Sequence, residues 1–178
     1  MLILGQRDDR WAKELLGTSK LTLGGAGCAV ACVAMWLNNV EEGRCCTPST
    51  VNKMLVLNKA FRDTNLVDWD KLPTMYPVIK YMGRIDCPNI PAPLPRINTL
   101  LNDTGVPVIV YVDSDVGPLF RQHFVLILRQ EGDNYVIADP WTGKERLLAK
   151  TQPGGNYYGP TAAVAICGVI VLGRGLST

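Results

Sequence analysis

Several features that would assign a chain to a class are missing from this sequence. It has a single histidine and no Cys-x-x-Cys pair, so a zinc site is not predicted. No apolar stretch reaches the roughly 18 residues of a membrane helix. The apolar start at residues 1–4 is too short for a signal-peptide core and runs into charged residues 7–10. We expect no metal, no membrane span and a cytoplasmic location, with a phage origin or release by another route left open.

An excess of charge of one sign is also lacking. The 178 residues carry 18 basic and 16 acidic side chains, without a run of like charges, so a nucleic-acid partner is not predicted. Nearly half of the residues are apolar (47%), which is ordinary for a globular domain and too apolar for disorder. We predict one domain spanning residues 1–178.

The six cysteines do not predict a disulfide scaffold, because a chain this long and apolar does not need cross-links to fold. Cys32, Cys87 and Cys167 lie in apolar surroundings and are expected to be buried. The neighbouring pair Cys45 and Cys46 lies in a polar loop, and the sequence gives it no role.

The first half of the chain reads as helices. Residues 28–39 are apolar almost all round, which is typical of a helix buried on every side. Thr47 and Pro48 supply a capping hydroxyl and a first-turn proline for a second helix. A short third helix is expected near Asp68, and a fourth over residues 95–102.

The second half reads as strands. Segments 106–112, 123–128, 135–138 and 162–172 are short and rich in β-branched residues, and the turn at 132–134 makes the middle two a hairpin. Helices followed by an antiparallel sheet give an α+β fold. The boundary between a helical lobe, about 1–90, and a sheet lobe, about 91–178, is placed in the proline-rich segment.

Cys28 is the candidate nucleophile. Glycines 24, 25 and 27 precede it, and the buried helix begins at the sulfur. Helix N-termini favour a thiolate, and glycines let a substrate approach the backbone, so Gly25 and Gly27 are candidate substrate-binding residues. The Cys28 amide could donate to an oxyanion. The alternative is a packing cysteine at the start of a core helix.

A cysteine nucleophile needs a base and a group that orients the base. The only histidine, His123, begins an apolar strand, and Asp139 ends the next one. If these strands form a hairpin around residues 132–134, the two side chains become neighbours. Taken singly, His123 could be an ordinary core or surface histidine and Asp139 a turn residue. Their occurrence with Cys28 predicts a Cys-His-Asp triad.

The motifs together resemble the double-glycine (bacteriocin-processing) peptidase-like branch of the papain-like cysteine peptidases. The resemblance covers residues 6 to about 145, and six segments carry it in the family's order. They are QRDDRW at 6–11, LGGAGCAV at 23–30, TP at 47–48 with VN at 51–52, LVDW at 66–69, HFVL at 123–126 and DPWTG at 139–143.

This resemblance implies a papain-like fold and a peptidase that needs no cofactor. It makes Cys28 the nucleophile, His123 the base and Asp139 the orienting residue. It also makes Gln6, by itself an ordinary surface glutamine, the side-chain donor to the oxyanion. The family usually has proline where this chain has Asp9, and the membrane and ATP-binding parts of transporter-linked members are missing.

The expected partner is a peptide or protein substrate, and Trp141 is a candidate contact to it. Aromatic side chains that could line the cleft are Trp11, Trp69, Trp141, Tyr157 and Tyr158. Three alternatives stay open. The site could act on the peptide bridges of cell walls, as a hydrolase or a transpeptidase. It could instead ligate a γ-glutamyl peptide, as the related phytochelatin synthases do. The chain could be a non-catalytic binding module, or Cys28 and Cys32 could form a redox or metal pair.

Overall fold

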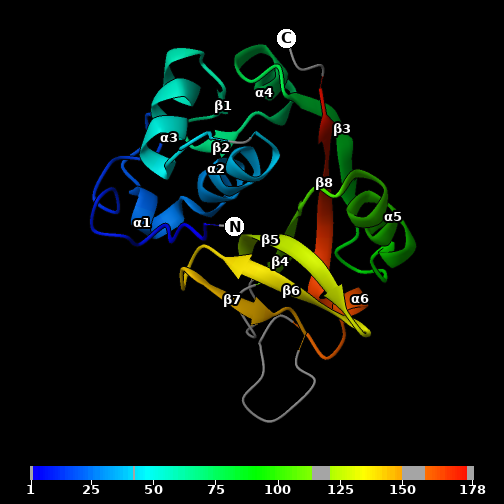
Figure 1. Cartoon of the computed structure of the whole chain (residues 1–178). Helices are drawn as coiled ribbons and strands as arrows, with labels where there is room; N and C mark the ends of the chain where they lie inside the picture. Colours follow the sequence, from blue (N-terminus) through cyan, green and yellow to red (C-terminus); the bar gives the residue numbers. More distant parts are fainter. Residues whose placement is uncertain (1, 42, 114–120, 150–158, 176–178) are drawn as a thin grey trace.

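The computed structural model describes residues 2–41, 43–113, 121–149 and 159–175. The fold is α+β, as predicted: N-terminal helices pack on a six-stranded antiparallel sheet (Figure 1). No helix in these described ranges is long and apolar enough to cross a membrane.

The central helix of the N-terminal part is α2, Cys28–Val40, which confirms the predicted helix. Its side chains are buried on nearly every side because it lies between the sheet and the other N-terminal helices, and it packs against β5 and α3. A single turn, α1 (Leu23–Ala26), leads into it. Helix α2 therefore holds its first residue against the sheet.

Helix α3, Pro48–Leu57, begins as predicted. The Thr47 hydroxyl accepts a hydrogen bond from the Thr50 amide, and Pro48 occupies the first turn. The Asn52 side chain, which is buried, accepts a hydrogen bond from the Gly17 amide and donates one to the Leu15 carbonyl. Asn52 thereby fixes the N-terminal loop to α3.

A small hairpin follows, with β1 (Phe61–Arg62) and β2 (Leu66–Val67). The predicted third helix is a 3₁₀ turn, η1 (Trp69–Lys71), continued by α4 (Leu72–Met75). Asp68 stands at the predicted cap position but makes no capping hydrogen bond, because its carboxylate instead pairs with Arg62.

The sheet has the strand order β3-β8-β4-β5-β6-β7, with every neighbouring pair antiparallel. The predicted hairpin is β5 with β6. The strands are β3 (Ile79–Asp86), β4 (Val108–Asp113), β5 (Gln122–Glu131), β6 (Asn134–Asp139), β7 (Lys144–Leu147) and β8 (Ile166–Arg174).

The two faces of the sheet carry separate cores because side chains alternate along each strand. In β4, Ile109 and Tyr111 face the N-terminal helices, whereas Val108 and Val110 face helices α5 and α6. Helix α5 (Leu94–Thr104) matches the predicted fourth helix and ends at Gly105, which has a positive φ; α6 is Ala162–Ala165. The central strands β8, β4 and β6 are thus buried on both faces, whereas the edge strands β3 and β7 are largely exposed or half-buried.

The structure differs from the sequence expectations in three places. The lobe boundary was predicted near residue 90, with helices before it and the sheet after it. Strand β3 lies before residue 90 but belongs to the sheet. Strand β7 was not expected, because its sequence KERL is charged and carries no apolar alternation. In the segment expected to be a strand, 162–172, the first residues form helix α6 and the strand, β8, begins only at Ile166.

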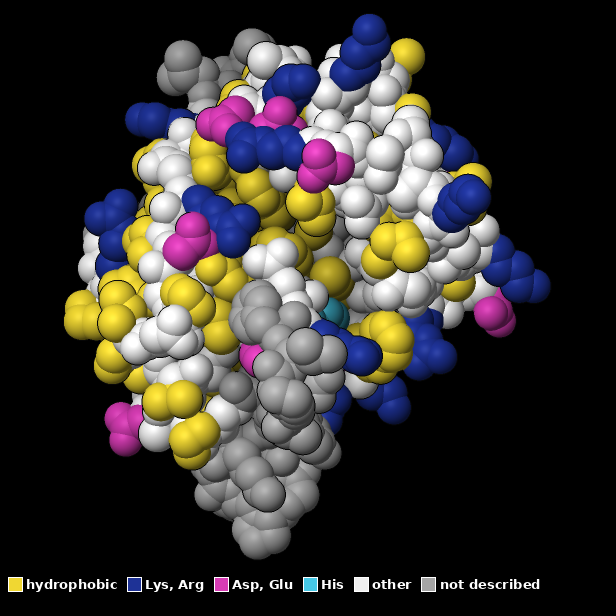
Figure 2. Space-filling view, turned by 180° about the vertical axis from the view of Figure 1, so that it is seen from behind, with side chains coloured by type: hydrophobic (Ala, Val, Ile, Leu, Met, Phe, Trp, Pro, Cys, Tyr) yellow, Lys and Arg dark blue, Asp and Glu magenta, His cyan; other side chains and the backbone are white. Residues whose placement is uncertain are grey.

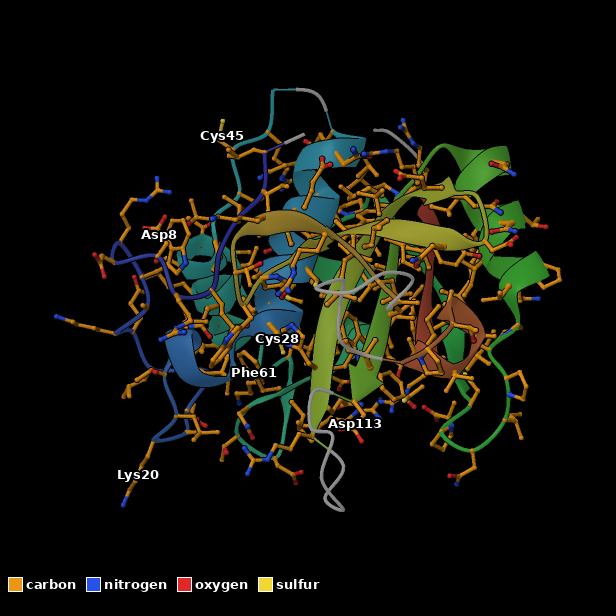
Figure 3. All side chains as sticks on the ribbon, turned by 90° about the horizontal axis from the view of Figure 1, so that it is seen from below. Asp8, Lys20, Cys28, Cys45, Phe61 and Asp113 are labelled. Carbon is orange, nitrogen blue, oxygen red and sulfur yellow. The ribbon has the colours of Figure 1, made fainter. Side chains whose placement is uncertain are left out.

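All six cysteines are free thiols, and Cys32, Cys87 and Cys167 are buried as expected. Cys45 is exposed, and Cys46 is tied to the C-terminal end of α2 by two hydrogen bonds with the Asn38 side chain. In Figure 3, Cys28 lies at one end of α2 and Cys45 lies beyond the other end.

Candidate active site

Cys28 is the first residue of α2, so its backbone amide has no partner within the helix. The side chain is nearly buried, with its residue 9% exposed. Gly27 precedes it and lies against α1: a Cβ atom at Gly27 would lie 2.6 Å from the Leu23 carbonyl oxygen. Only glycine can lie this close to the Leu23 carbonyl. Because α1 and α2 are joined through Gly27 alone, α2 begins at Cys28.

His123 lies near the start of β5, opposite Val112 of β4, and is buried. Its Nε2 atom is 2.9 Å from Oδ1 of Asp139. The Cys28 side chain lies close enough to the imidazole to raise the pKa of His123. Because Nε2 faces the carboxylate, Nδ1 is the ring nitrogen that could serve the sulfur. The histidine therefore stands between the cysteine and the aspartate.

Asp139 ends β6 and is fully buried. Its Oδ1 accepts a hydrogen bond from the Trp141 amide at 2.9 Å, and its Oδ2 accepts one from the Thr142 hydroxyl at 3.3 Å. The Arg146 guanidinium lies 3.5 Å from Oδ2. Burial alone would raise the pKa of Asp139, but its hydrogen bond to His123 and these neighbours lower it. The aspartate is held as an anion.

The pKa of His123 follows from the same contacts. Burial favours the neutral ring and lowers the pKa, but the hydrogen bonds to Asp139 and Cys28 outweigh it and raise the pKa to about 9. The protonated imidazolium therefore predominates at neutral pH.

Gln6 is brought to the site by the N-terminal loop and is only 1% exposed. Its backbone amide donates to the Pro140 carbonyl at 2.7 Å, which ties Gln6 to the turn after Asp139. Its side-chain Nε2 donates to the Gly24 carbonyl at 3.1 Å. An amide nitrogen has two N–H groups, so one is left to bind a substrate oxygen.

These side chains open into a cleft of about 1090 Å³ between the N-terminal helices and the sheet. Figure 2 shows the histidine, in cyan, in a recess beside hydrophobic side chains. None of the described lining residues is acidic, and four are arginines. The lining comprises Gln6, Gly25, Ala26, Cys28, Ala29, Arg62, Asn65, Leu66, Val67, Trp69, Tyr81, Arg84, Arg121, Gln122, His123, Phe124, Trp141, Thr142 and Arg146.

The candidate site residues occupy different positions relative to this cleft. Cys28, His123 and Gln6 line it, as do the predicted substrate contacts Gly25 and Trp141. Asp139 lies behind His123 and does not line the cleft, and neither does the buried Gly27, whose tight packing on α1 gives it a structural role.

Of the other aromatic candidates, Trp69 lines the cleft and packs against Phe124, with ring centroids 5.6 Å apart. Trp11 is buried outside it, and its indole nitrogen donates to the Gly5 carbonyl. Tyr157 and Tyr158 lie outside the described residues. Within the described part of the chain, no group of three or more His, Cys, Asp or Glu side chains could hold a metal ion.

The sequence did not single out Arg146 or the role of Thr142. Thr142 stands within the DPWTG segment, so its nearness to Asp139 could have been expected from the turn. Arg146 lies on β7, directly opposite Ile137. No signal in the sequence predicted this strand, so nothing placed Arg146 beside Asp139.

Comparison with protein family models, with curated proteins and with solved structures finds no match to this chain.

Proposed function

We propose that the chain is a cysteine peptidase that hydrolyses peptide bonds through a thioester on Cys28. The observation that carries this proposal is the position of His123, hydrogen-bonded to Asp139 and close to Cys28, with both His123 and Cys28 lining one cleft. A nucleophile, a base and a group that orients the base are the three parts of a catalytic triad.

In the first step, the Cys28 sulfur attacks the carbonyl carbon of the bound peptide as a thiolate, with its proton already held by His123. A C–S bond forms and the carbonyl electrons move to the oxygen. The Cys28 amide and the Gln6 side chain are the donors for this oxyanion. Both are positioned before the substrate binds, because Gln6 is buried and the amide is fixed by the helix.

The imidazolium of His123 then gives its proton to the leaving nitrogen as the C–N bond breaks. The products are an amine and an acyl-enzyme. A water molecule next attacks the thioester while His123 removes its proton; a C–O bond forms, the C–S bond breaks and the acid leaves. Asp139 stabilises the imidazolium in both steps through its 2.9 Å contact with Nε2.

We also propose that the fold is papain-like and that the chain belongs to the double-glycine peptidase-like branch. Support comes from the placement of the four candidate residues on the elements that the sequence resemblance implied. The cysteine begins the central helix, the histidine and aspartate lie on neighbouring antiparallel strands, and the glutamine precedes the helix. The N-terminal helices and the sheet enclose the cleft between them.

The test compares the wild type with Cys28→Ala on a mixture of synthetic peptides that includes Gly-Gly bonds and cell-wall bridge peptides, with products identified by mass spectrometry. Cys45→Ala is the matched control, since Cys45 is an exposed cysteine at the far end of α2. We expect the wild type and Cys45→Ala to cleave the same bonds and Cys28→Ala to cleave none while keeping its unfolding midpoint.

Alkylation by iodoacetamide gives a second readout that needs no substrate. We expect Cys28 in the wild type to react faster than Cys45, although Cys45 is the more exposed of the two. His123→Ala should remove this difference, because it removes the base. If Cys28 reacts no faster than Cys45 and no peptide is cleaved, the chain is a non-catalytic binding module and the proposal is wrong.

A further inference from the structure

A second, shallower hollow adjoins the cleft beyond Trp141. Its volume is about 590 Å³, and it shares Trp141, Thr142 and Arg146 with the cleft. The remaining lining comes from Arg7, Lys144 and Glu145. A molecule bound beside His123 can therefore extend into this hollow, which we call the basic hollow.

Strand β7 places two of its cations. Lys144 lies directly opposite Asp139, and Arg146 is two residues further along β7, so both project on the sheet face that carries the Asp139 side chain. Glu145 projects the other way, where its carboxylate pairs with Arg129 at 3.2 Å. Alternation along β7 thus places both cations on the face of the Asp139 side chain, while Glu145, which also lines the hollow, pairs with Arg129.

The third cation comes from the N-terminal loop. The Arg7 guanidinium lies over the Trp141 ring, 4.6 Å from its centroid. This stacking holds the planar group while its N–H edges stay able to donate. The same loop carries Gln6, whose backbone is bonded to Pro140. Arg7 is therefore fixed relative to the catalytic residues.

Among the described residues that line the basic hollow, cations outnumber carboxylates. Arg7 and Lys144 are cationic, Arg146 pairs with Asp139, and the acidic residue among them, Glu145, pairs with Arg129. Asp139, the carboxylate next to Arg146, is fully buried and engaged by His123. Guanidinium groups bind carboxylates through paired hydrogen bonds. The hollow suits an anion better than a neutral or basic group.

The position of the hollow indicates which part of a substrate it would hold. His123 must reach the leaving nitrogen to protonate it, so the portion of the peptide after the cleaved bond lies beside the His123–Asp139 pair. The residues that follow Asp139 along the chain line the basic hollow. The leaving portion is therefore directed toward Arg7 and Lys144.

Resting on the proposed function, we propose that the basic hollow binds a carboxylate carried by the substrate on the leaving side of the cleaved bond. The carboxylate is either the C-terminal group of a short leaving peptide or the side chain of an acidic residue near the cleavage point. The class of substrate is thus a peptide that is anionic after its cleaved bond.

The experiment uses peptides cleaved by the wild type, prepared as matched pairs that differ by one charge. One arm compares a free C-terminal acid with its amide; the other compares Glu with Gln at each of the first three positions after the cleaved bond, with amidated ends. The double variant Arg7→Gln/Lys144→Gln is set against Lys13→Gln/Lys20→Gln, which removes two exposed cations from elsewhere.

For the wild type and the Lys13/Lys20 variant, we expect kcat/KM to favour the anionic member of at least one pair by about tenfold. This ratio should fall as salt is added, because screening weakens exposed charge pairs. For Arg7→Gln/Lys144→Gln the ratio should fall to about one. The arm that shows the preference identifies the source of the carboxylate.

A direct binding measurement separates this inference from the proposed function. Calorimetry with Cys28→Ala and the leaving-side product peptides should give tighter binding of acid than of amide. If the wild type cleaves peptides but neither measurement shows a charge preference, the inference is wrong and the proposed function stands. If the wild type cleaves none of the peptides and the product peptides do not bind, both are wrong.

Discussion

Gly5 and Gly143 lie in such close contact that a Cβ atom on either residue would be 3.3 Å from the Cα of the other. Gly143 has φ +65°, in the region that favours glycine. This contact presses the N-terminal loop, with Gln6 and Arg7, against the turn that follows Asp139. Gln6, the proposed oxyanion donor, and the turn that follows Asp139 are therefore held together through two residues that have no side chain.

Replacing Gly143 by alanine should lower both stability and activity. The positive φ costs about 1–2 kcal/mol for a residue with a Cβ, and the added atom pushes the Gln6 loop away. Since small displacements in an active site are costly, we expect kcat/KM to fall about tenfold or more. Gly132→Ala is the control: it has a similar φ, +59°, but nothing lies within 4 Å of its Cβ position.

Gly132→Ala should lose similar stability in urea unfolding while keeping its activity. Equal kcat/KM in the two variants would show that the contact between Gly5 and Gly143 does not position Gln6.

Asp139→Asn should reduce kcat/KM on the order of 100-fold and move its alkaline limb to lower pH. The Asp139 carboxylate is one of the contacts that raise the pKa of His123 to about 9. Without the negative charge, the imidazolium loses its proton at lower pH and can no longer protonate the leaving group. The measurement is kcat/KM from pH 5 to 10. An alkaline limb at the same pH in both proteins would contradict this role for Asp139.

The stability of the protein should depend on pH through His123. Its pKa is raised from 6.5 to about 9 by folding, so its contribution is complete below pH 6.5 and is lost as the pH rises through 9. The loss is on the order of 3 kcal/mol at most. Urea unfolding between pH 6 and 10 should show this decline. It should be smaller in His123→Gln, and the same decline in that variant would assign it to other groups.

At the acidic end the sign is reversed. The pKa of Asp139 is lowered by folding, so its contribution is present above the ordinary carboxyl value of 3.8 and is lost as the pH falls through the folded value.

Asn52→Ala should destabilise the fold by about 2–4 kcal/mol, because it leaves the Gly17 amide and the Leu15 carbonyl without partners. The matched control is Asn58→Ala. Asn58 makes one exposed hydrogen bond, to the Met54 carbonyl, and its loss should cost a few tenths of a kcal/mol. The free energies of unfolding in urea check both. Similar losses in the two variants would mean that Asn52 does not hold the N-terminal loop.

The sequence predicted those elements whose signals are local. The helix over 28–39, the Thr47 cap and the hairpin around residues 132–134 depend on periodicity and turn chemistry within a few residues. Strand β7 could not be found in this way, because it is an edge strand with charged residues that face solvent or the active site. In strand β3 only Ile79 is buried, the other positions alternate between exposed and half-buried, and there is no continuous apolar run.

The same distinction applies to the candidate site. The proximity of His123 and Asp139 follows from a predicted hairpin, so it could be expected from the sequence alone. The contact of Arg146 with Asp139 needs the position of β7, and the seating of Arg7 on Trp141 needs the docking of the N-terminal loop. The Arg7–Trp141 contact joins segments far apart in the chain, and the Arg146–Asp139 contact, although the two residues are close in sequence, depends on a strand that carries no local signal.

The place of β8 in the sheet has a consequence for biosynthesis. In the described part of the chain it is the last strand, yet it stands between β3 and β4 and provides the pairing that attaches β3. A nascent polypeptide that still lacks residues 166–174 can therefore form hairpins but cannot complete the sheet. We expect a ribosome-held chain to leave β3 without its sheet partner until this segment emerges.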